Sequence, residues 1–199
     1  MKLNELCDFI NGLWKGKKPP FINVGVIRNT NFTKDCQLDD SDVAYIDVEK
    51  SKFETRKLKF GDIILEKSGG GPSQPVGRIV KFEKRSGDFS FSNFTSVIRI
   101  KDNEQVDYQY LYYYLYFFYV SGKTELLQRR STGIRNLRFK EYKEIDIPLP
   151  SLSEQQRIVE LLDQYFEKKE KAEKTLKLQL AMLGELSSSI LFNAFNGEL

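Results

Sequence analysis

The run from residue 153 to residue 199 constrains this chain more than any other stretch, because it predicts one long helix. It contains no proline, and Gly184 is its only glycine before the last three residues. Ser153 followed by Gln156 is the pattern of a capping box, and Pro150 prevents the helix from extending further back. At ~1.5 Å per residue this helix would be about 60–70 Å long. A small domain needs no helix of that length, so we expect it to pack against a partner.

Apolar residues recur along this run at the spacing of a coiled coil. If Leu162 occupies an a position, the a and d positions are Ile158, Leu162, Tyr165, Lys169, Ala172, Leu176, Gln179, Leu183, Leu186 and Ile190. Only Lys169 and Gln179 among them are polar. Heptads sustained over this length favour a coiled coil.

The two polar positions predict the orientation of the partner helix. In an antiparallel pair of identical helices, a positions face d positions, and the numbers of facing residues add up to a constant. With a sum of 348, Lys169 faces Gln179 and Ile158 faces Ile190. A slip of one heptad would place the Lys169 ammonium against apolar side chains, which is costly. We therefore expect an antiparallel homodimer centred near Lys174; the alternative is that the stripe packs on the chain's own domain.

Composition indicates a globular protein of the prokaryotic cytoplasm. Apolar residues make up 40% and charged residues 30% of the chain. No uninterrupted apolar run reaches the ~18 residues of a membrane span, and the N-terminus lacks the apolar core of a signal peptide. Cys7 and Cys36 are too few for a disulfide scaffold. We expect no membrane association and reduced thiols.

Charge is distributed unevenly along the chain. Residues 1–150 carry 25 Lys and Arg against 20 Asp and Glu, whereas residues 151–199 carry 6 against 8. The basic excess is largest between residues 121 and 143, where seven bases accompany two acids. A basic domain joined to an acidic helix is typical of proteins with a polyanionic partner such as nucleic acid.

The hydrophobic pattern predicts an α+β fold: a domain over residues 1–150 with a small mixed β-sheet and flanking helices, then the coiled-coil helix over residues 151–199. We expect a short helix over 3–10 and a loop over 123–142. Runs of strand type cover residues 22–32, 40–53, 58–70, 75–83, 89–102 and 144–150. Residues 108–119 include nine aromatics, yet Leu111, Leu115 and Phe118 recur at helical spacing, so we expect a helix there. Its tyrosines either pack on the sheet, which we favour, or form a platform on which bases stack.

The sequence carries no recognisable catalytic or cofactor-binding constellation. It has no histidine, and two isolated cysteines do not build a zinc site. The glycine-rich stretch SGGGPSQPVGR lacks the Gly-Lys-Ser/Thr ending of a phosphate-binding loop, and no G-x-G-x-x-G occurs. We expect neither enzymatic activity nor a bound cofactor or metal.

Polar and basic residues in three segments suit DNA binding instead. Arginine pairs with guanine, asparagine with adenine, and hydroxyl and ammonium groups with phosphates. The candidates are Lys15, Lys17, Lys18, Ser68, Gln74, Arg78, Arg129, Arg130, Ser131, Thr132, Arg135, Asn136 and Arg138. Ile134 and Leu137 are expected to anchor the third segment to the core.

Three stretches together resemble the specificity (S) subunit of type I restriction–modification systems. They are LKFGDIILEKSGGGPSQPVGRIVKF, STGIRNLRFKEYKEIDIPLPSLSEQQRIVELLD and SSSILFNAFNGEL. In that family two target-recognition domains, each followed by a long helix, lie along DNA with their helices antiparallel. This chain resembles half of such a subunit, which would have to pair with itself or with a different half.

The resemblance implies a non-catalytic subunit that reads a bipartite inverted-repeat site in double-stranded DNA. Methyltransferase (M) subunits, and restriction (R) subunits where present, would supply the chemistry with S-adenosylmethionine and ATP. Two other classes remain open: a stand-alone enzyme acting on nucleic acid, and a coiled-coil scaffold or recombination-cassette remnant that binds no DNA.

Overall fold

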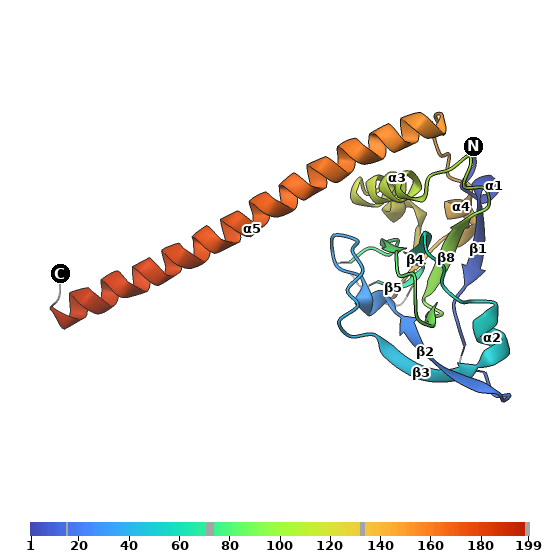
Figure 1. Cartoon of the computed structure of the whole chain (residues 1–199), viewed down its shortest axis with the longest axis horizontal. Helices are drawn as coiled ribbons and strands as arrows, with labels where there is room; N and C mark the ends of the chain where they lie inside the picture. The colour runs from blue at the N-terminus through green and yellow to red at the C-terminus, as the bar shows by residue number, and fades with distance from the viewer. Residues whose placement is uncertain (15, 71–73, 132–133, 198–199) are drawn as a thin grey trace. The chain divides into compact units, whose positions relative to one another are not determined.

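The structure is a computed structural model that describes residues 1–14, 16–70, 74–131 and 134–197. These residues form two compact units, Met1–Gln156 and Arg157–Leu199 (Figure 1). The first unit holds all the described strands, and the second belongs to the long helix α5 (Leu152–Asn196). The predicted α+β class with a long C-terminal helix is confirmed.

An antiparallel sheet of four strands forms the centre of the first unit. Its strand order is β1-β8-β4-β6, with β1 at Cys7–Asn11, β8 at Thr95–Ile100, β4 at Asp62–Glu66 and β6 at Ile79–Phe82. Every residue of β4 is buried, because both faces of the sheet are covered. A strand buried on both faces reads as a continuous apolar run, as Ile63, Ile64 and Leu65 do.

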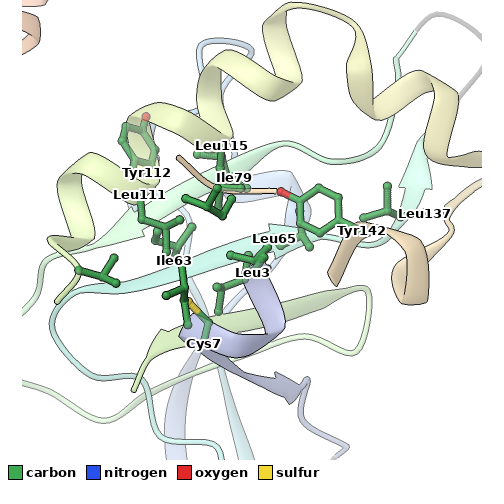
Figure 2. Close-up of a cluster of buried hydrophobic side chains, with 14 of the residues drawn as sticks. Leu3, Cys7, Ile63, Leu65, Ile79, Leu111, Tyr112, Leu115, Leu137 and Tyr142 are labelled. Carbon is green, nitrogen blue, oxygen red and sulfur yellow. The ribbon is translucent and has the colours of Figure 1, made fainter. Parts of the chain in front are cut away.

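One face of this sheet packs against helices. Figure 2 shows Ile63 near Leu111 and Ile79 near Leu115 of α3 (Tyr108–Val120), and Leu65 belongs to the same cluster. The short helices α1 (Leu3–Leu6) and α4 (Phe139–Lys143) close the same cluster. Residues from both ends of the first unit therefore share one core.

The other face packs against a second sheet. This sheet has the order β3-β2-β7, with β3 at Ala44–Glu49, β2 at Phe21–Ile27 and β7 at Phe89–Phe91. β2 pairs antiparallel with β3 and parallel with β7, which makes the β-structure mixed. Ile64 and Val97 from the central sheet meet Ile27 and Phe91 from the second. Helix α2 (Lys50–Glu54) places Phe53 in a third, smaller cluster.

Helix α3 is the aromatic helix predicted for residues 108–119. Asp107 caps it by accepting hydrogen bonds from the backbone amides of Gln109 and Tyr110. The hydroxyls of Tyr110 and Tyr112 donate to the carbonyls of Pro148 and Cys36, at 2.8 and 2.9 Å. These two tyrosines are thus buried and bonded, which supports packing rather than a base-stacking platform.

Three local predictions are wrong. The segment over 3–10 is helical only to Leu6, because from Cys7 onward it pairs with β8. Residues 144–150 form no strand; they contact the N-terminus through one isolated bridge and a few backbone bonds, including Ile147 N to Met1 O at 2.8 Å. Helix α5 is capped by Ser151 instead of Ser153, since Ser151 Oγ accepts from Glu154 N at 3.4 Å.

Helix α5 contains 45 residues, which corresponds to about 68 Å at ~1.5 Å per residue. Its first turn belongs to the first unit, where the Gln155 side chain is fully buried. Beyond that turn the helix exposes large apolar side chains of the predicted stripe. These exposed members are Tyr165, Leu176, Leu183, Leu186 and Ile190. No helix among the described residues is long and apolar enough to cross a membrane.

Candidate nucleic-acid interface

A small third sheet brings together two of the segments proposed to bind DNA. Its order is β5-β10-β9, with β5 at Ser68–Gly70, β10 at Ile134–Leu137 and β9 at Gln128–Ser131. The glycine-rich stretch and the basic stretch are more than fifty residues apart in the chain. Antiparallel pairing of β10 with β5 makes them neighbours.

The basic stretch is a hairpin and not the loop expected over 123–142. β9 and β10 pair from Gln128 with Leu137 to Ser131 with Ile134. Leu137 is buried in the main core, as predicted for an anchor, while the side chain of Ile134 is outside the described part. Because neighbouring residues of a strand point to opposite faces, burial of Leu137 directs Asn136 outward.

Three hydrogen-bonding side chains form one row across this outward face. Asn136 is the register partner of Ser68 on one side and of Arg129 on the other. Residues directly opposite each other in a sheet share a face. Ser68 Oγ donates to Asn136 Oδ1 at 2.5 Å, which leaves the Asn136 amide nitrogen to donate elsewhere. Arg129 at the end of the row is exposed. We call Ser68, Asn136 and Arg129 the outward row.

The remaining basic residues of this segment have different surroundings. Arg130 and Arg135 are backbone register partners in the hairpin. Arg138 Nη1 donates to Glu141 Oε1 at 3.0 Å, and its Nη2 donates to the Leu126 carbonyl, so this guanidinium already has local partners. Ser131 belongs to β9, and Thr132 lies outside the described residues.

The first predicted segment is not joined to this sheet by any hydrogen bond of the described residues. The backbone amides of Lys17 and Lys18 donate to Glu49 Oε2, both at 3.3 Å, beside the edge strand β3. Both side chains are exposed, and Lys15 falls outside the described residues. Lys17 and Lys18 therefore form a basic site separate from the β5-β10-β9 sheet, both in sequence and in hydrogen bonding.

Arg78 is buried, so its predicted contact with DNA must be corrected. Its guanidinium donates twice to Glu66, Nε to Oε2 at 2.9 Å and Nη2 to Oε1 at 2.8 Å. It also donates to the carbonyls of Phe32 and Asn29, at 2.6 and 3.1 Å. Burial by itself lowers the pKa of Arg78, but the hydrogen bonds and charge of Glu66 outweigh it and leave the pKa raised. Arg78 is a structural cation.

Gln74 belongs with Arg78 and not with the outward row. With its amide oxygen turned toward the guanidinium, Gln74 accepts from Arg78 at 2.8–2.9 Å. Arg78 thereby connects the end of the glycine-rich stretch to the interior. Of the three residues predicted from that stretch, only Ser68 reaches the outward row.

Lys67 has a position that no sequence pattern marks. It immediately precedes β5, and its ammonium donates to Asn11 Oδ1 at 3.0 Å. The same ammonium lies 5.4 Å from the centre of the Phe139 ring. Burial, and secondarily the charge of Lys143, lower the pKa of Lys67 below its usual range. Its neighbours come from residues 11, 139 and 143, so only the tertiary structure reveals them.

No group of three or more His, Cys, Asp or Glu residues suited to a metal ion occurs in the described part of the chain. Burial raises the pKa of the Cys7 thiol to about 12 and of the Cys36 thiol to about 11, and both are free. The polar surface of the β5-β10-β9 sheet thus offers hydrogen bonds and positive charge, which is binding chemistry.

Comparison with known proteins identifies the family. Residues 1–182 match the family model described as type I restriction modification DNA specificity domain. The specificity subunit of the type I restriction enzyme EcoKI from Escherichia coli strain K12 is 25% identical over 98% of this chain and 41% of that protein. The EcoBI specificity subunit of Escherichia coli is 40% identical over 33% of this chain and 14% of that protein.

Solved structures show the same fold. A chain from a study of complex assembly and conformational transition of the type I R-M system has a TM-score of 0.72 at 23% identity, over all of this chain and 45% of that one. The HsdS subunit from Thermoanaerobacter tengcongensis has a TM-score of 0.60 at 21% identity, over all of this chain and 44% of that one. This chain spans less than half the length of these relatives. The match over most of its length shows that the chain belongs to the family of type I restriction–modification DNA specificity domains.

Proposed function

We propose that this domain reads a DNA sequence through the outward row of the β5-β10-β9 sheet. The observation that carries the proposal is the row itself: Ser68, Asn136 and Arg129 lie side by side on one face. Further arginines belong to the same hairpin. The predicted DNA contacts of Arg130, Ser131, Thr132, Arg135 and Arg138 remain part of the proposal, without a place in the outward row. Lys17 and Lys18 would bind phosphates at a separate place.

The geometry of a narrow β-sheet suits this role. The major groove of B-DNA is about 12 Å wide and admits a two-stranded β-ribbon. Asn136 would bind adenine with its free amide nitrogen and its oxygen, and Arg129 would bind guanine with two donors. Each such pair discriminates against a wrong base by about 1–3 kcal/mol. Ser68 would hold the Asn136 amide in one orientation through their hydrogen bond.

Selection from a pool of random duplexes tests this proposal. The full chain, alone and mixed with a methyltransferase subunit of a type I system, should enrich a defined sequence. Asn136→Ala should relax the preference at one base pair, whereas Lys17→Ala should weaken binding of all sequences by the same factor. Lys34→Ala, an exposed lysine on another turn, is the control. Enrichment of no sequence by the wild-type chain would contradict sequence-specific reading.

We further propose that two copies pair through α5, antiparallel and with facing numbers that add up to 348. Support comes from the exposed stripe, whose large apolar side chains have no cover in the single chain. Unpaired stripes of this size mark interaction surfaces. The Lys169 ammonium, which lies 3.6 Å from the Glu173 carboxylate, would meet Gln179 of the other copy at the crossing.

Cysteine crosslinking tests orientation and register. In a chain whose buried Cys7 and Cys36 are replaced by alanine, we introduce Ile158→Cys in one copy and Ile190→Cys in the other. Efficient crosslinking of 158 to 190 is expected, with little of 158 to 158. Dominant 158 to 158 crosslinks would indicate a parallel pair, and a monomer at all concentrations would refute pairing with itself and leave a different half as partner.

Such a dimer would present two domains to an inverted repeat, at a spacing set by the helices. Insertion of seven residues into α5 keeps its stripe in phase and should lengthen the unread spacer between half-sites. An unchanged site in methylation sequencing would refute this. We also propose that methyltransferase subunits, and restriction subunits where present, dock on this assembly in the cytoplasm and carry out the chemistry.

A further inference from the structure

Two lysines from distant parts of the chain contact one phenyl ring, and one of them, Lys67, immediately precedes Ser68 of the outward row. The ammonium of Lys67 lies 5.4 Å, and that of Lys143 4.6 Å, from the centre of the Phe139 ring. The Lys143 ammonium also lies 4.7 Å from the ring centre of Phe9, which packs edge-on against Phe139. Aromatic rings from β1 and α4 therefore contact both positive charges.

No carboxylate neutralises this pair in the described part of the chain. The acids nearest in sequence are engaged: Glu66 with Arg78, Glu141 with Arg138, and Glu144 with the Asn4 amide. Lys57 gives the contrast, because its ammonium lies 5.4 Å from the Phe53 ring centre but also 2.6 Å from Asp88. The lowered pKa of Lys67 reflects burial first and then the like charge of Lys143. Two half-buried cations without an acid are stabilised by an external anion.

The position of the pair links that anion to the DNA surface. The Lys67 carbonyl accepts from Leu137 N of β10 at 2.8 Å, and the next residue, Ser68, is the first of the outward row. Lys143 lies in α4, which follows β10 after Arg138. Among the described residues Lys67 donates to one acceptor, Asn11, so two of its three donors can bind a ligand.

We propose that Lys67 and Lys143 together bind one phosphate group of the DNA backbone next to the bases read by the outward row. The inference rests on the proposed DNA-binding function and adds a specific phosphate site to it. Both ammonium groups contact aromatic rings, and that of Lys67 also donates to Asn11 Oδ1, so these contacts position them before DNA arrives. They would therefore set the register of the sheet along the duplex, because phosphate contacts position a protein and base contacts specify the sequence.

Salt dependence of DNA binding measures the site directly. Each phosphate contact that is lost reduces the slope of log K against log salt by about 0.9. Lys67→Met and Lys143→Met in the full chain should each show this reduction with duplex DNA of mixed sequence, and about eightfold weaker binding at about 0.1 M salt. The double variant should show little further loss, because one phosphate is shared. Lys57→Met is the control, because Lys57 also contacts a phenyl ring but is paired with Asp88. This variant should keep the wild-type slope.

Two more measurements separate this site from a structural role and from the wider proposal. Lys67→Met should melt at the wild-type temperature or above it, because it removes a half-buried charge; a clear drop in melting temperature with an unchanged slope would assign Lys67 to folding and overturn the inference. Titration of the wild-type chain with inorganic phosphate should shift the ammonium NMR signals of both lysines. Wild-type slopes in both variants overturn the phosphate site and leave DNA reading intact. If the wild-type chain binds phosphate but no DNA, the proposed function fails, and the inference fails with it.

Discussion

The buried pair of Glu66 and Arg78 gives the sharpest prediction about stability. Arg78→Met removes the guanidinium and leaves the Glu66 carboxylate, 1% exposed, with a single weak donor, Asn29 Nδ2 at 3.3 Å. Two charge-assisted hydrogen bonds of 2.8 and 2.9 Å disappear at once. Carbonyl groups of Phe32 and Asn29 lose a donor in addition.

The expected loss follows from these contacts. Removal of one partner from a buried ion pair costs about 3–5 kcal/mol, because the other charge remains buried without compensation. Domains of this size have a total free energy of unfolding of about 5–15 kcal/mol, so Arg78→Met should remove a large share of it. The double variant Glu66→Leu, Arg78→Met should lose less than Arg78→Met alone, since no charge then stays unpaired.

Urea denaturation followed by circular dichroism measures these differences. An m-value that stays constant between variants confirms that the midpoint shift reports stability. The double-mutant cycle then gives the coupling between Glu66 and Arg78. If Arg78→Met lost less than about 1 kcal/mol of stability but weakened DNA binding, the structural role of Arg78 would be refuted, and its prediction as a DNA contact would be restored.

Three further predictions concern buried groups and backbone. Gln155→Ala should cost about 2–4 kcal/mol in the free energy of unfolding by urea, because the buried amide bonds Asp107 N, Gln105 O and Pro150 O at 2.9–3.0 Å. The pKa values of Cys7 and Cys36 are raised in the folded chain, so as pH rises the unfolded chain loses these thiol protons first. The free energy of unfolding measured by urea should therefore fall above pH ~8.5, by about 1.4 kcal/mol per pH unit for each thiol. Replacing either cysteine by alanine should make this fall with pH less steep. Gly77→Ala should lower the melting temperature more than Gly122→Ala, because both have positive φ but only at Gly77 would the new Cβ meet Thr124, at 3.0 Å.

Long periodic elements could be predicted from the sequence, because their signal is local. Helix α5 follows from unbroken apolar heptads, and α3 follows from leucines at helical spacing in spite of its many aromatics. The first residue of α5 could not be predicted with the same precision. Both Ser151 and Ser153 suit a cap, and the choice depends on Gln155, whose side chain bonds Gln105 and Pro150 inside the domain.

The candidate site was only partly predictable, because strand pairing decided it. The stretch over 128–137 is polar and has little apolar alternation, so it reads as a loop. It becomes a hairpin because Leu137 packs in the core and β5 offers an edge for β10. Gly133 between two short runs was the available sequence signal, since glycine is typical of hairpin turns. Ser68, Asn136 and Arg129 could be chosen as candidates from their side-chain types. Only the pairing of β5, β10 and β9 shows that they lie in one row.

The basic residues of this domain differ in role according to the acid that the fold places beside each of them. Arg78 has the residue type and the sequence context of a DNA contact, yet Glu66, twelve positions earlier, lies on the same strand pair and binds it inside. Lys57 and Lys84 are neutralised at the surface by Asp88 and Asp40. An arginine or lysine whose charge is already compensated gains little from a phosphate, because binding would first have to break its ion pair. Cations that the fold holds in place without an acid gain the full attraction, and on that ground Lys67 is a stronger candidate for DNA binding than Arg78, although sequence chemistry alone selects Arg78.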